Sequence, residues 1–568
     1  MADNFVDILS GKKESIICKL SSTAKETVQH NRHILAKIIQ VVLLLGKQNI
    51  PFRGHTEERS NFMAVLQSHA QTDPLLANHL QHGKDNARYT SPEIQNKLIS
   101  LCADQVRQQI ISECRKSDFF AVMADEATDC STKEQLSICV RYVVHNGEQY
   151  QLFEKFIGFV TCSSIKGVHL ANEILDHLQG CGLDILKLRG QCYDGAGNMA
   201  GKYNGVQALV RERVPLASYV HCKSHCLNLS VVHTCKLQCV RTMMKTVQDI
   251  GFAFSYSGKR LEAFVTELSE DPVTRAQLEG RQKLKTLCET RWMSHADALT
   301  TFKQAFSVVV HALESLEADN DDKAGEHVRA ILRFDFIITL VTCEHVLNIL
   351  VGLTGILQEV SMDLLEAVRE AGVVVDILRA ERQDDAVFDA IYQTAVDIAA
   401  EFQIDASVPR QAARQRHRAN YQIGDPKEYW RVSLFNVFVD HLAEEISTRV
   451  MSNHDRFCAQ MLMPSKIRNL NDEHVDSIFT SYSQDMNISK EVFQGEIRRW
   501  RARWSQDDGR PRPSTLLSLL DSTPKAAYPG IHKALSVLLT MPATSASCER
   551  SFSSMRRIKS YMRSTNDG

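Results

Sequence analysis

The feature that most constrains the fold is a change of hydrophobic period after a helical N-terminal region. Three short runs, FFAVMADEA, LSICVRYVVHN and YQLFEKFIGFV, are rich in Val, Ile, Phe and Tyr and follow one another closely. This composition is typical of strands. Asn146-Gly147 separates the last two runs, and this dipeptide is typical of a hairpin. The sequence therefore predicts three consecutive antiparallel strands.

Helices and strands alternate after these runs. VHLANEILDHLQG predicts a helix at about 168–180, ended by Gly180 and Gly182. ILKLRGQCYD predicts a fourth strand, NGVQALVRERV a helix, and SYVHCKSHCLNLSVV a short fifth strand that runs into a helix. The order strand, strand, strand, helix, strand, helix, strand, helix is that of a ribonuclease H-like domain. The predicted fold class is therefore α/β.

The chain length predicts several domains, because 568 residues exceed one ordinary core. Residues 1–60 predict an N-terminal helical segment, and residues 61–300 predict the first part of the ribonuclease H-like domain. From 301 to 520 the periodicity is helical, which predicts a large all-α insertion. Residues 521–568 contain PATSASCERSFSSMRRI, which reads as the start of a helix that returns to the catalytic domain.

Composition says little about partners. Apolar residues make up 44% and charged residues 24%, which are globular values. Because the net charge is −2, any nucleic-acid surface must be a local patch. Sixteen cysteines without framework spacing indicate reduced intracellular thiols, and the polar start indicates no signal peptide. The apolar run ILAKIIQVVLLLG is too short to span a bilayer and predicts a buried amphipathic helix, so no membrane association is expected.

Three acidic residues on separate elements are the candidate catalytic and metal-binding groups. Asp125 ends the first strand run, Asp194 follows the fourth, and Glu549 lies on the C-terminal helix. Hard divalent cations prefer oxygen ligands, and two of them can activate an attacking oxygen and stabilise a leaving one. The positions therefore predict a site for two Mg²⁺ or Mn²⁺ ions. Taken singly, the residues could be loop or capping acids, and Glu549 could pair with Arg556 or Arg557.

Several separated motifs resemble those of the hAT superfamily of DNA transposases and its domesticated relatives. FRGHTEERSNF, ADEATDCSTKEQLSICVRYV and CYDGAGNMAGKYNGVQ look like the domain of unknown function of the zinc-finger MYM-type and repressor-of-the-protein-kinase-inhibitor groups. TSASCERSFSSMRRIKSYMRST is similar to the C-terminal dimerisation segment of the family. The motifs stand in the order of the family and cover almost the whole chain.

The resemblance implies a ribonuclease H-like catalytic domain interrupted by a helical insertion. It maps the acidic triad of the family onto Asp125, Asp194 and Glu549. It also implies DNA as a partner, strand cleavage and transfer through hairpin intermediates, homo-oligomerisation through the C-terminal segment, and a nuclear location.

Further residues are implied as DNA contacts. Cys222 and His225 match the Cys-x-x-His motif of the family, and they could instead pack and form hydrogen bonds near the catalytic site. Arg291 and Trp292 match the Arg-Trp motif of the family, in which the aromatic ring stabilises a flipped base. Trp292 could equally be a core residue. Local phosphate-binding patches are expected at three basic runs: Arg410, Arg414, Arg416 and Arg418; Arg498, Arg499, Arg501 and Arg503 with Trp500 and Trp504; and Arg556, Arg557 and Lys559.

Two departures from the family pattern keep the activity open. Cys18 is the only cysteine before Cys102, so no N-terminal zinc finger is expected, and the chain stops at RSTNDG where the family continues. A second hypothesis is thus a domesticated, non-catalytic nuclear protein acting through protein association and DNA contact. A third is a nuclease for RNA–DNA hybrids. No structural zinc is expected, because these residues lack paired-knuckle spacing: His221, Cys222, His225, Cys226, His233, Cys235 and Cys239.

Overall fold

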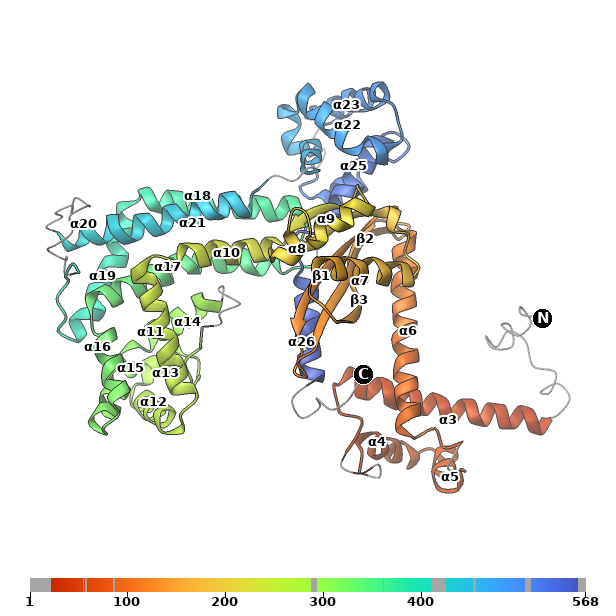
Figure 1. Cartoon of the computed structure of the whole chain (residues 1–568), viewed down its shortest axis with the longest axis horizontal. Coiled ribbons are helices and arrows are strands. Elements are labelled where there is room, and N and C mark those ends of the chain that lie inside the picture. Colours follow the sequence, from red (N-terminus) through yellow and green to blue (C-terminus); the bar gives the residue numbers. More distant parts are fainter. Residues whose placement is uncertain are drawn as a thin grey trace. The chain divides into compact units, whose positions relative to one another are not determined.

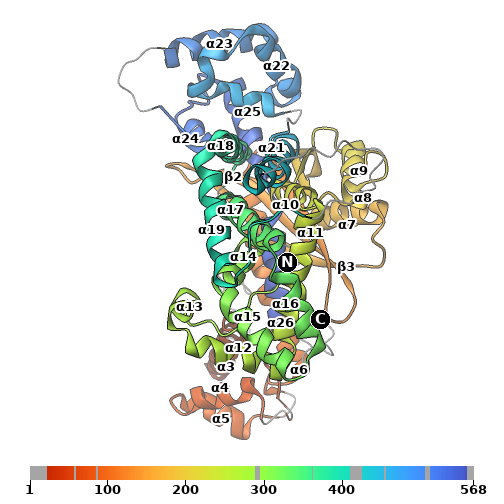
Figure 2. The ribbon, with the colours of Figure 1, turned by 90° about the vertical axis from the view of Figure 1, so that its left-hand side faces the viewer.

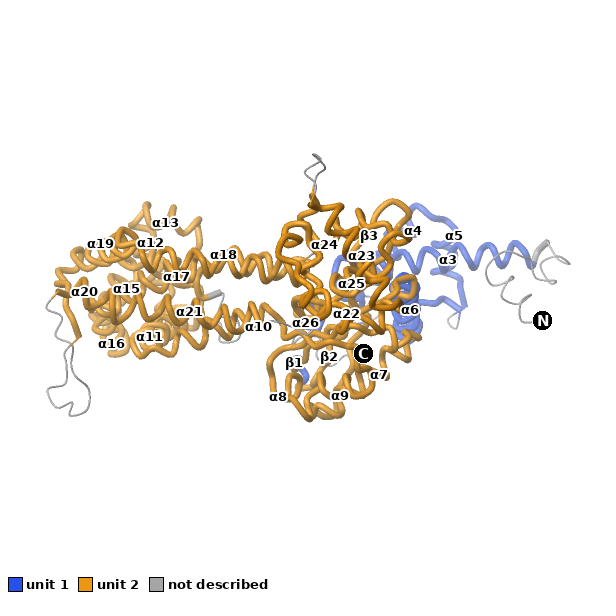
Figure 3. Tube along the Cα trace, turned by 90° about the horizontal axis from the view of Figure 1, so that it is seen from above, with its two compact units in different colours: residues 1–113, 129–131, 553–568 blue, residues 114–128, 132–552 orange. Residues whose placement is uncertain are grey.

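The computed structural model describes residues 22–559, apart from residues 55, 57–58, 85–86, 288–293, 361, 410–424, 453–455 and 506–511. The chain divides into two compact units (Figure 3). The first comprises residues 1–113, 129–131 and 553–568, and the second comprises residues 114–128 and 132–552. The four predicted domains, with boundaries after residues 60, 300 and 520, stay a prediction.

The first unit has a small helical core. Its helices are α3 (Ser22–Lys47), α4 (Asn61–Ala70), α5 (Pro74–His82) and the first part of α6 (Pro92–Lys116). The side chains of Ser60 and Asp73 accept backbone N–H groups and so cap α4 and α5. Apolar residues at helical spacing form the core: Ile34, Ile38, Val41, Leu45, Phe62, Leu66, Leu76 and Leu98. The prediction of a buried amphipathic helix in α3 is confirmed.

A five-stranded mixed sheet forms the centre of the second unit. Its strands are β1 (Phe120–Thr128), β2 (Glu134–His145), β3 (Tyr150–Cys162), β4 (Leu188–Tyr193) and β5 (Ser218–His221). The order across the sheet is β3-β2-β1-β4-β5. β2 runs antiparallel to β1 and β3, whereas β4 runs parallel to β1 and β5. The predicted antiparallel trio is confirmed, and Gly147 turns the hairpin with a φ of 102°.

Helices from distant parts of the sequence pack on this sheet. They are α7 (Gly167–Gly180), α8 (Gly197–Ala200), α9 (Val206–Arg213), α25 (Pro529–Thr540) and α26 (Ala546–Ile558). α7 packs on β3 and α9 on α7, whereas α25 packs on β2 and β4. Figures 1 and 2 show α7, α8 and α9 gathered together. The segment after α25 approaches β4 so closely that a Cβ on Gly190 would lie 3.0 Å from Pro542.

All regular elements that the structure describes between residues 223 and 521 are helices, whereas the periodicity predicts an all-helical region only for residues 301–520. They are α10 (Lys223–Thr234), α11 (Gln238–Ser255), α12 (Gly258–Glu270), α13 (Pro272–Gln277), α14 (Ser294–Gln304), α15 (Phe306–Ala318), α16 (Asp322–Ile331), α17 (Phe334–Leu357), α18 (Leu364–Gln383), α19 (Asp385–Glu401), α20 (Pro426–Trp430), α21 (Val437–Arg449), α22 (Asp472–Met486), α23 (Lys490–Ser505) and α24 (Leu516–Asp521), besides short π and 3₁₀ turns.

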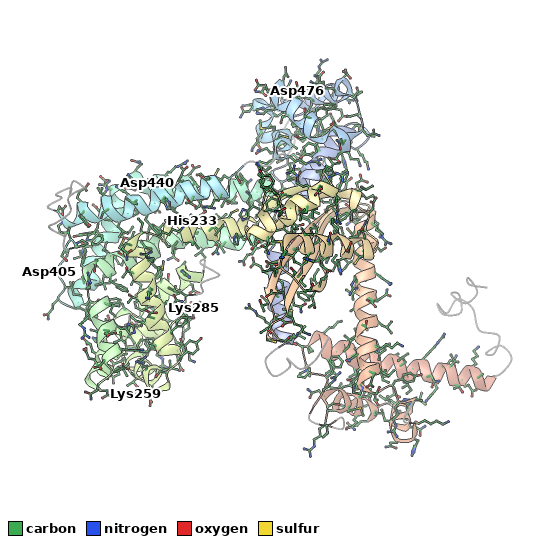
Figure 4. The ribbon with its side chains drawn as sticks, in the orientation of Figure 1. His233, Lys259, Lys285, Asp405, Asp440 and Asp476 are labelled. Atoms are coloured by element: carbon green, nitrogen blue, oxygen red, sulfur yellow. The ribbon has the colours of Figure 1, made fainter. Side chains whose placement is uncertain are left out.

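These helices pack into an apolar core that extends to the sheet. Figure 4 labels His233 on α10 and Asp440 on α21, two helices that lie side by side, and Arg449 donates a hydrogen bond to His233 Nδ1 at 3.3 Å. Among the described residues, α17 is the one helix long and apolar enough to cross a membrane. The rest of the protein buries 72% of its most apolar window, so packing accounts for this composition.

Candidate functional site

Asp125 and Asp194 lie at the same edge of the sheet. Asp125 is in the last part of β1, and Asp194 comes directly after β4. β1 and β4 are parallel neighbours, so their carboxyl ends meet at one edge. The structure thus places both carboxylates where the strand order predicts them.

Glu549 reaches this edge from the C-terminal helix. It lies in the first turn of α26. Ser137 is the partner of Asp125 in the β1–β2 register, and its hydroxyl is hydrogen-bonded to the Ser551 hydroxyl at 2.7 Å. This bond holds the beginning of α26 beside the end of β1.

The charges of the three carboxylates act on one another. The pKa of Asp125 is raised well above its ordinary value, first by burial and then by the negative charges of Glu549 and Asp194. A hydrogen bond of 3.1 Å from the Glu126 N–H opposes this rise. Three remote carboxylates therefore concentrate negative charge at one place.

This charge and donor set fit a divalent cation. Carboxylate oxygens are the ligands that Mg²⁺ and Mn²⁺ prefer, and a cation would offset the repulsion that raises the pKa of Asp125. Within the part of the chain that the structure describes, however, no three His, Cys, Asp or Glu side chains converge as a preformed metal site. The three carboxylates thus suit a divalent cation by their ligand type and by their position at one edge of the sheet.

Cys222 holds the segment that leads into α26. Its side chain is fully buried, and its sulfur accepts the Ser545 N–H at 3.3 Å. The next residue, Lys223, donates its backbone N–H to the Ala543 carbonyl at 2.9 Å. A hydrogen bond with Cys192 lowers the pKa of the Cys222 thiol to about 7. Since no surface of Cys222 is exposed, its burial favours the predicted packing role over direct contact with DNA.

His221 is a site residue that the sequence analysis weighed only as a zinc ligand. Its ring lies against Gly195, where a Cβ would be 2.6 Å from His221 Nε2. Burial, followed by the charge of His225, lowers the pKa of His221 to about 4, and the two ring centroids are 5.5 Å apart. His221 Nε2 is buried without a hydrogen-bond partner in the described structure. His221 is therefore a neutral side chain with an unused nitrogen directly beside the residue after Asp194.

Glu126 adds a fourth carboxylate at this edge of the sheet. Asn198 Nδ2 donates to Glu126 Oε1 at 2.6 Å and to the Ile165 carbonyl at 3.0 Å. Burial raises the pKa of Glu126, and the charge of Asp194 adds to the rise. In the sequence, the position of Glu126 directly after Asp125 at the end of a strand was the signal that could have identified it as a site residue.

Two regions of the chain match known protein families, and two curated proteins resemble most of its length. Residues 2–205 match the ZMYM1/FAM200 RNase-like domain, and residues 501–567 match the hAT family C-terminal dimerisation region. The chain is thus a hAT-derived protein. The "52 kDa repressor of the inhibitor of the protein kinase" of Homo sapiens is 23% identical over 563 residues, which cover 94% of this chain and 72% of the relative. The Mus musculus protein of the same name is 23% identical over 567 residues, covering 94% and 73%.

Four residues expected to contact DNA in this hAT-derived protein lie outside the described residues. They are Arg291, Trp292, Arg414 and Arg416, and their roles stay predictions. The remaining one, His225, is half-buried on the first turn of α10, beside His221.

The basic run on α23 packs largely against its own unit. Trp500 and Trp504 are buried, and the guanidinium groups of Arg499, Arg501 and Arg503 donate to the carbonyls of Ala527, Leu470 and Ser522. These contacts attach α23 to its neighbours. The hAT-derived protein thus uses three of the four arginines of this run for packing, which weakens the expectation that the run binds phosphate.

The apolar stripe of the dimerisation region also packs internally. Four apolar residues of α25 that could lie in the core or in a dimer seam are buried at 1% exposure or less: Leu535, Val537, Leu538 and Leu539. Phe552 is 6% exposed, and its ring is tilted against the ring of Phe159 with centroids 5.5 Å apart. In the hAT-derived protein these side chains therefore belong to the core of the second unit.

Proposed function

We propose that this hAT-derived protein cleaves and transfers DNA strands with Asp125, Asp194 and Glu549. The observation that carries the proposal is the geometry of one sheet edge. Asp125 and Asp194 lie at the carboxyl ends of the parallel strands β1 and β4, and the Ser137–Ser551 hydrogen bond holds α26, which carries Glu549, beside β1. The domain would be ribonuclease H-like, and the helices between β5 and α25 would form its insertion. Mg²⁺ or Mn²⁺, held by the three carboxylates, would supply Lewis-acid activation of the phosphodiester.

The surrounding residues prepare this edge for phosphate chemistry. Asp194 Oδ1 accepts the Ala196 N–H at 3.1 Å, which orients the carboxylate and leaves its second oxygen for a ligand. Neutral His221 adds no charge beside Asp194, and its Nε2 is buried without a hydrogen-bond partner in the described structure. Asp125 must be ionised to bind a cation, so its raised pKa couples cation binding to the loss of a proton from this carboxyl group.

The test is strand cleavage and strand transfer on labelled DNA that carries the ends of the neighbouring element, with Mn²⁺ or Mg²⁺. Asp194→Asn and Glu549→Gln should each lower the rate by more than about 100-fold, the upper range for the outer shell of a metal site. Asp476→Asn on α22 is the matched control, because this carboxylate pairs with Lys490 and its side chain is 54% exposed. Equal rates in all variants would refute the assignment of the triad.

A non-catalytic nuclear protein is the second candidate. Two observations favour it: the relatives are named as repressors, and the described side chains form no preformed metal group. This candidate function predicts that folded wild-type protein does not cleave DNA. It also predicts that the protein still associates with DNA or with another protein. An RNA–DNA hybrid in the same assay tests the nuclease hypothesis, since preferential hybrid cleavage would replace the transposase-type assignment.

We also propose that the protein is nuclear and self-associates through its C-terminal segment. The dimerisation-region match supports self-association, and Ile558 near the end of α26 is 59% exposed. Light scattering of the purified chain should give a mass above 64.0 kDa. A monomer at all concentrations would remove this part of the proposal. A fluorescent fusion confined to the cytoplasm would remove the nuclear location.

A further inference from the structure

An exposed aromatic and apolar patch lies on the segments that follow β3 and β4. Tyr203 is 78% exposed, and Ile165 and Val168 are 52% and 51% exposed. The two segments are in contact, because a Cβ on Gly167 would lie 2.2 Å from the Asn204 carbonyl oxygen. Exposed apolar groups that gather on neighbouring segments are typical of binding surfaces.

The backbone presents Tyr203 on a closed turn. The Gly205 N–H donates to the Gly201 carbonyl at 3.2 Å, and Gln207 Nε2 donates to the same carbonyl at 3.1 Å. A Cβ on Gly205 would lie 2.3 Å from the Gly201 nitrogen, so only glycine permits this approach. Tyr203 stands in the middle of this turn, and its exposure is a consequence of the backbone.

Two lysines give the patch positive charge. Lys202 Nζ lies 5.6 Å from the centroid of the Tyr203 ring, and exposed Lys166 immediately precedes Gly167. Neither lysine forms an ion pair within the described structure. By contrast, three arginines of the basic run on α23 are used for internal hydrogen bonds. The two lysines are therefore available to an external anion.

Asn198 connects the patch to the candidate site. Its amide donates both to Glu126, next to Asp125, and to the carbonyl of Ile165 in the patch. The turn that carries Tyr203 also begins seven residues after Asp194 and three after Asn198. The patch is thus fixed relative to the acidic edge of the sheet.

We propose that this patch, Tyr203 with Lys166, Lys202, Ile165 and Val168, binds an unpaired nucleotide segment of the DNA that the acidic edge would process. The ring would stack on a base and the two lysines would hold adjacent phosphates, as in proteins that bind single strands. This inference rests on the proposed function and adds to it a surface that contacts unpaired DNA. An acidic protein segment is the other class of occupant, but an exposed aromatic ring beside Lys202 favours a base with its phosphates.

The experiment measures binding of the full chain to a fluorescent duplex with a single-stranded extension, by anisotropy at several salt concentrations. Tyr203→Ala should weaken binding roughly 5- to 100-fold, and Tyr203→Phe should bind like wild type because stacking needs only the ring. Lys202→Gln should reduce the slope of log affinity against log salt by about 1. The matched control is Tyr256→Ala, which removes a tyrosine that is 85% exposed at the end of α11.

The outcomes separate this inference from the proposed function. If wild-type protein binds or cleaves the DNA and Tyr203→Ala behaves like Tyr256→Ala, the patch assignment is wrong and the proposed function stands. If wild-type protein neither binds nor cleaves DNA, both are wrong. If Tyr203→Ala changes only the mass measured by light scattering, the patch is a self-association surface and the nucleotide assignment is overturned.

Discussion

The sulfur of Cys222 accepts the backbone N–H of Ser545 at 3.3 Å, across 323 residues of sequence. The bond joins the β5–α10 junction to the residue that precedes α26, the helix that carries Glu549. One buried thiol therefore contributes to the position of a carboxylate that the chain supplies from its far end.

Cys222→Ala should loosen the acidic edge. We expect the free energy of unfolding to fall by about 1–2 kcal/mol, because a buried side chain and a hydrogen bond are lost. The affinity for Mn²⁺, measured by titration calorimetry, should fall as well. Cys343→Ala is the matched control, since Cys343 is equally buried on α17 and lies outside the site. Equal Mn²⁺ affinities in the two variants would show that Cys222 only fills space.

Asp125→Asn should stabilise the protein at neutral and alkaline pH. The folded-state pKa of Asp125 is raised, so its stabilising contribution is present below about pH 4, the ordinary value, and is lost as the pH rises through the raised pKa. Asparagine does not ionise, so the stability of Asp125→Asn does not fall as the pH rises through that pKa. Urea unfolding at about pH 8 without divalent cations should show a gain of about 1–2 kcal/mol. The gain should shrink toward about pH 4, and a gain that is independent of pH would contradict this account.

Divalent cations should stabilise the wild-type protein. At a cation concentration about 100 times the Kd, the free energy of unfolding should rise by about 2.7 kcal/mol if only the folded state binds the ion. Asp194→Asn should lose most of this gain in Mn²⁺, measured by thermal unfolding with and without a chelator. Asp476→Asn should keep it. Equal stabilisation of both variants would place the ion elsewhere.

Glu154→Gln should destabilise the second unit. Arg141 and Glu154 form a buried pair at 2.7 Å with side-chain exposures of 0% and 5%, and Arg141 also donates to the Met362 carbonyl at 2.9 Å. Loss of the carboxylate charge leaves a buried guanidinium without its counter-ion, which costs about 3–5 kcal/mol. Urea unfolding measures the change.

The matched control for that pair is Asp319→Asn. Its partner is Lys259, and the side chains of the two residues are 64% and 62% exposed. An exposed pair of this kind contributes about 1 kcal/mol or less. Similar decreases in the free energy of unfolding of Glu154→Gln and Asp319→Asn would show that Arg141 does not depend on Glu154 as a buried counter-ion.

Alanine should have opposite effects at two glycines. Gly205→Ala places a Cβ 2.3 Å from the Gly201 nitrogen, so the turn must open and the free energy of unfolding should fall by about 1–3 kcal/mol. Gly495 lies within α23, and a Cβ there meets nothing within 4 Å. Gly495→Ala should therefore raise stability by about 0.5–1 kcal/mol. Changes of the same sign in both variants would show that the turn at Gly205 tolerates a side chain.

Much of the fold around the sheet could be predicted from local pattern. The Asn146-Gly147 dipeptide marks the β2–β3 hairpin, Ser91-Pro92 marks the start of α6, and Gly180 ends α7. In each case the residue itself sets the backbone dihedrals or removes a hydrogen-bond donor, so the signal is local. The positions of Asp125 after a buried run and of Asp194 after β4 follow from the same reasoning.

The surroundings of the candidate site could not be predicted in this way. Sequence pattern does not show that His221 lies against Gly195, that Asn198 binds Glu126, or that the arginines of α23 bond to internal carbonyls. A histidine, an asparagine or an arginine carries donors and acceptors that suit either solvent or another segment. Which of these it meets depends on contacts between residues far apart in the chain.

The sequence by itself determined the order of strands and helices, the strand ends that carry two carboxylates and the helix that carries the third. Those properties depend on neighbouring residues, through hydrophobic period and backbone preference. Only the tertiary structure decided that the three carboxylates share one edge, that Cys222 is buried beneath it and that Tyr203 stands exposed beside it. These outcomes depend on strand pairing and packing between distant segments, and burial then sets the protonation of Asp125 and His221.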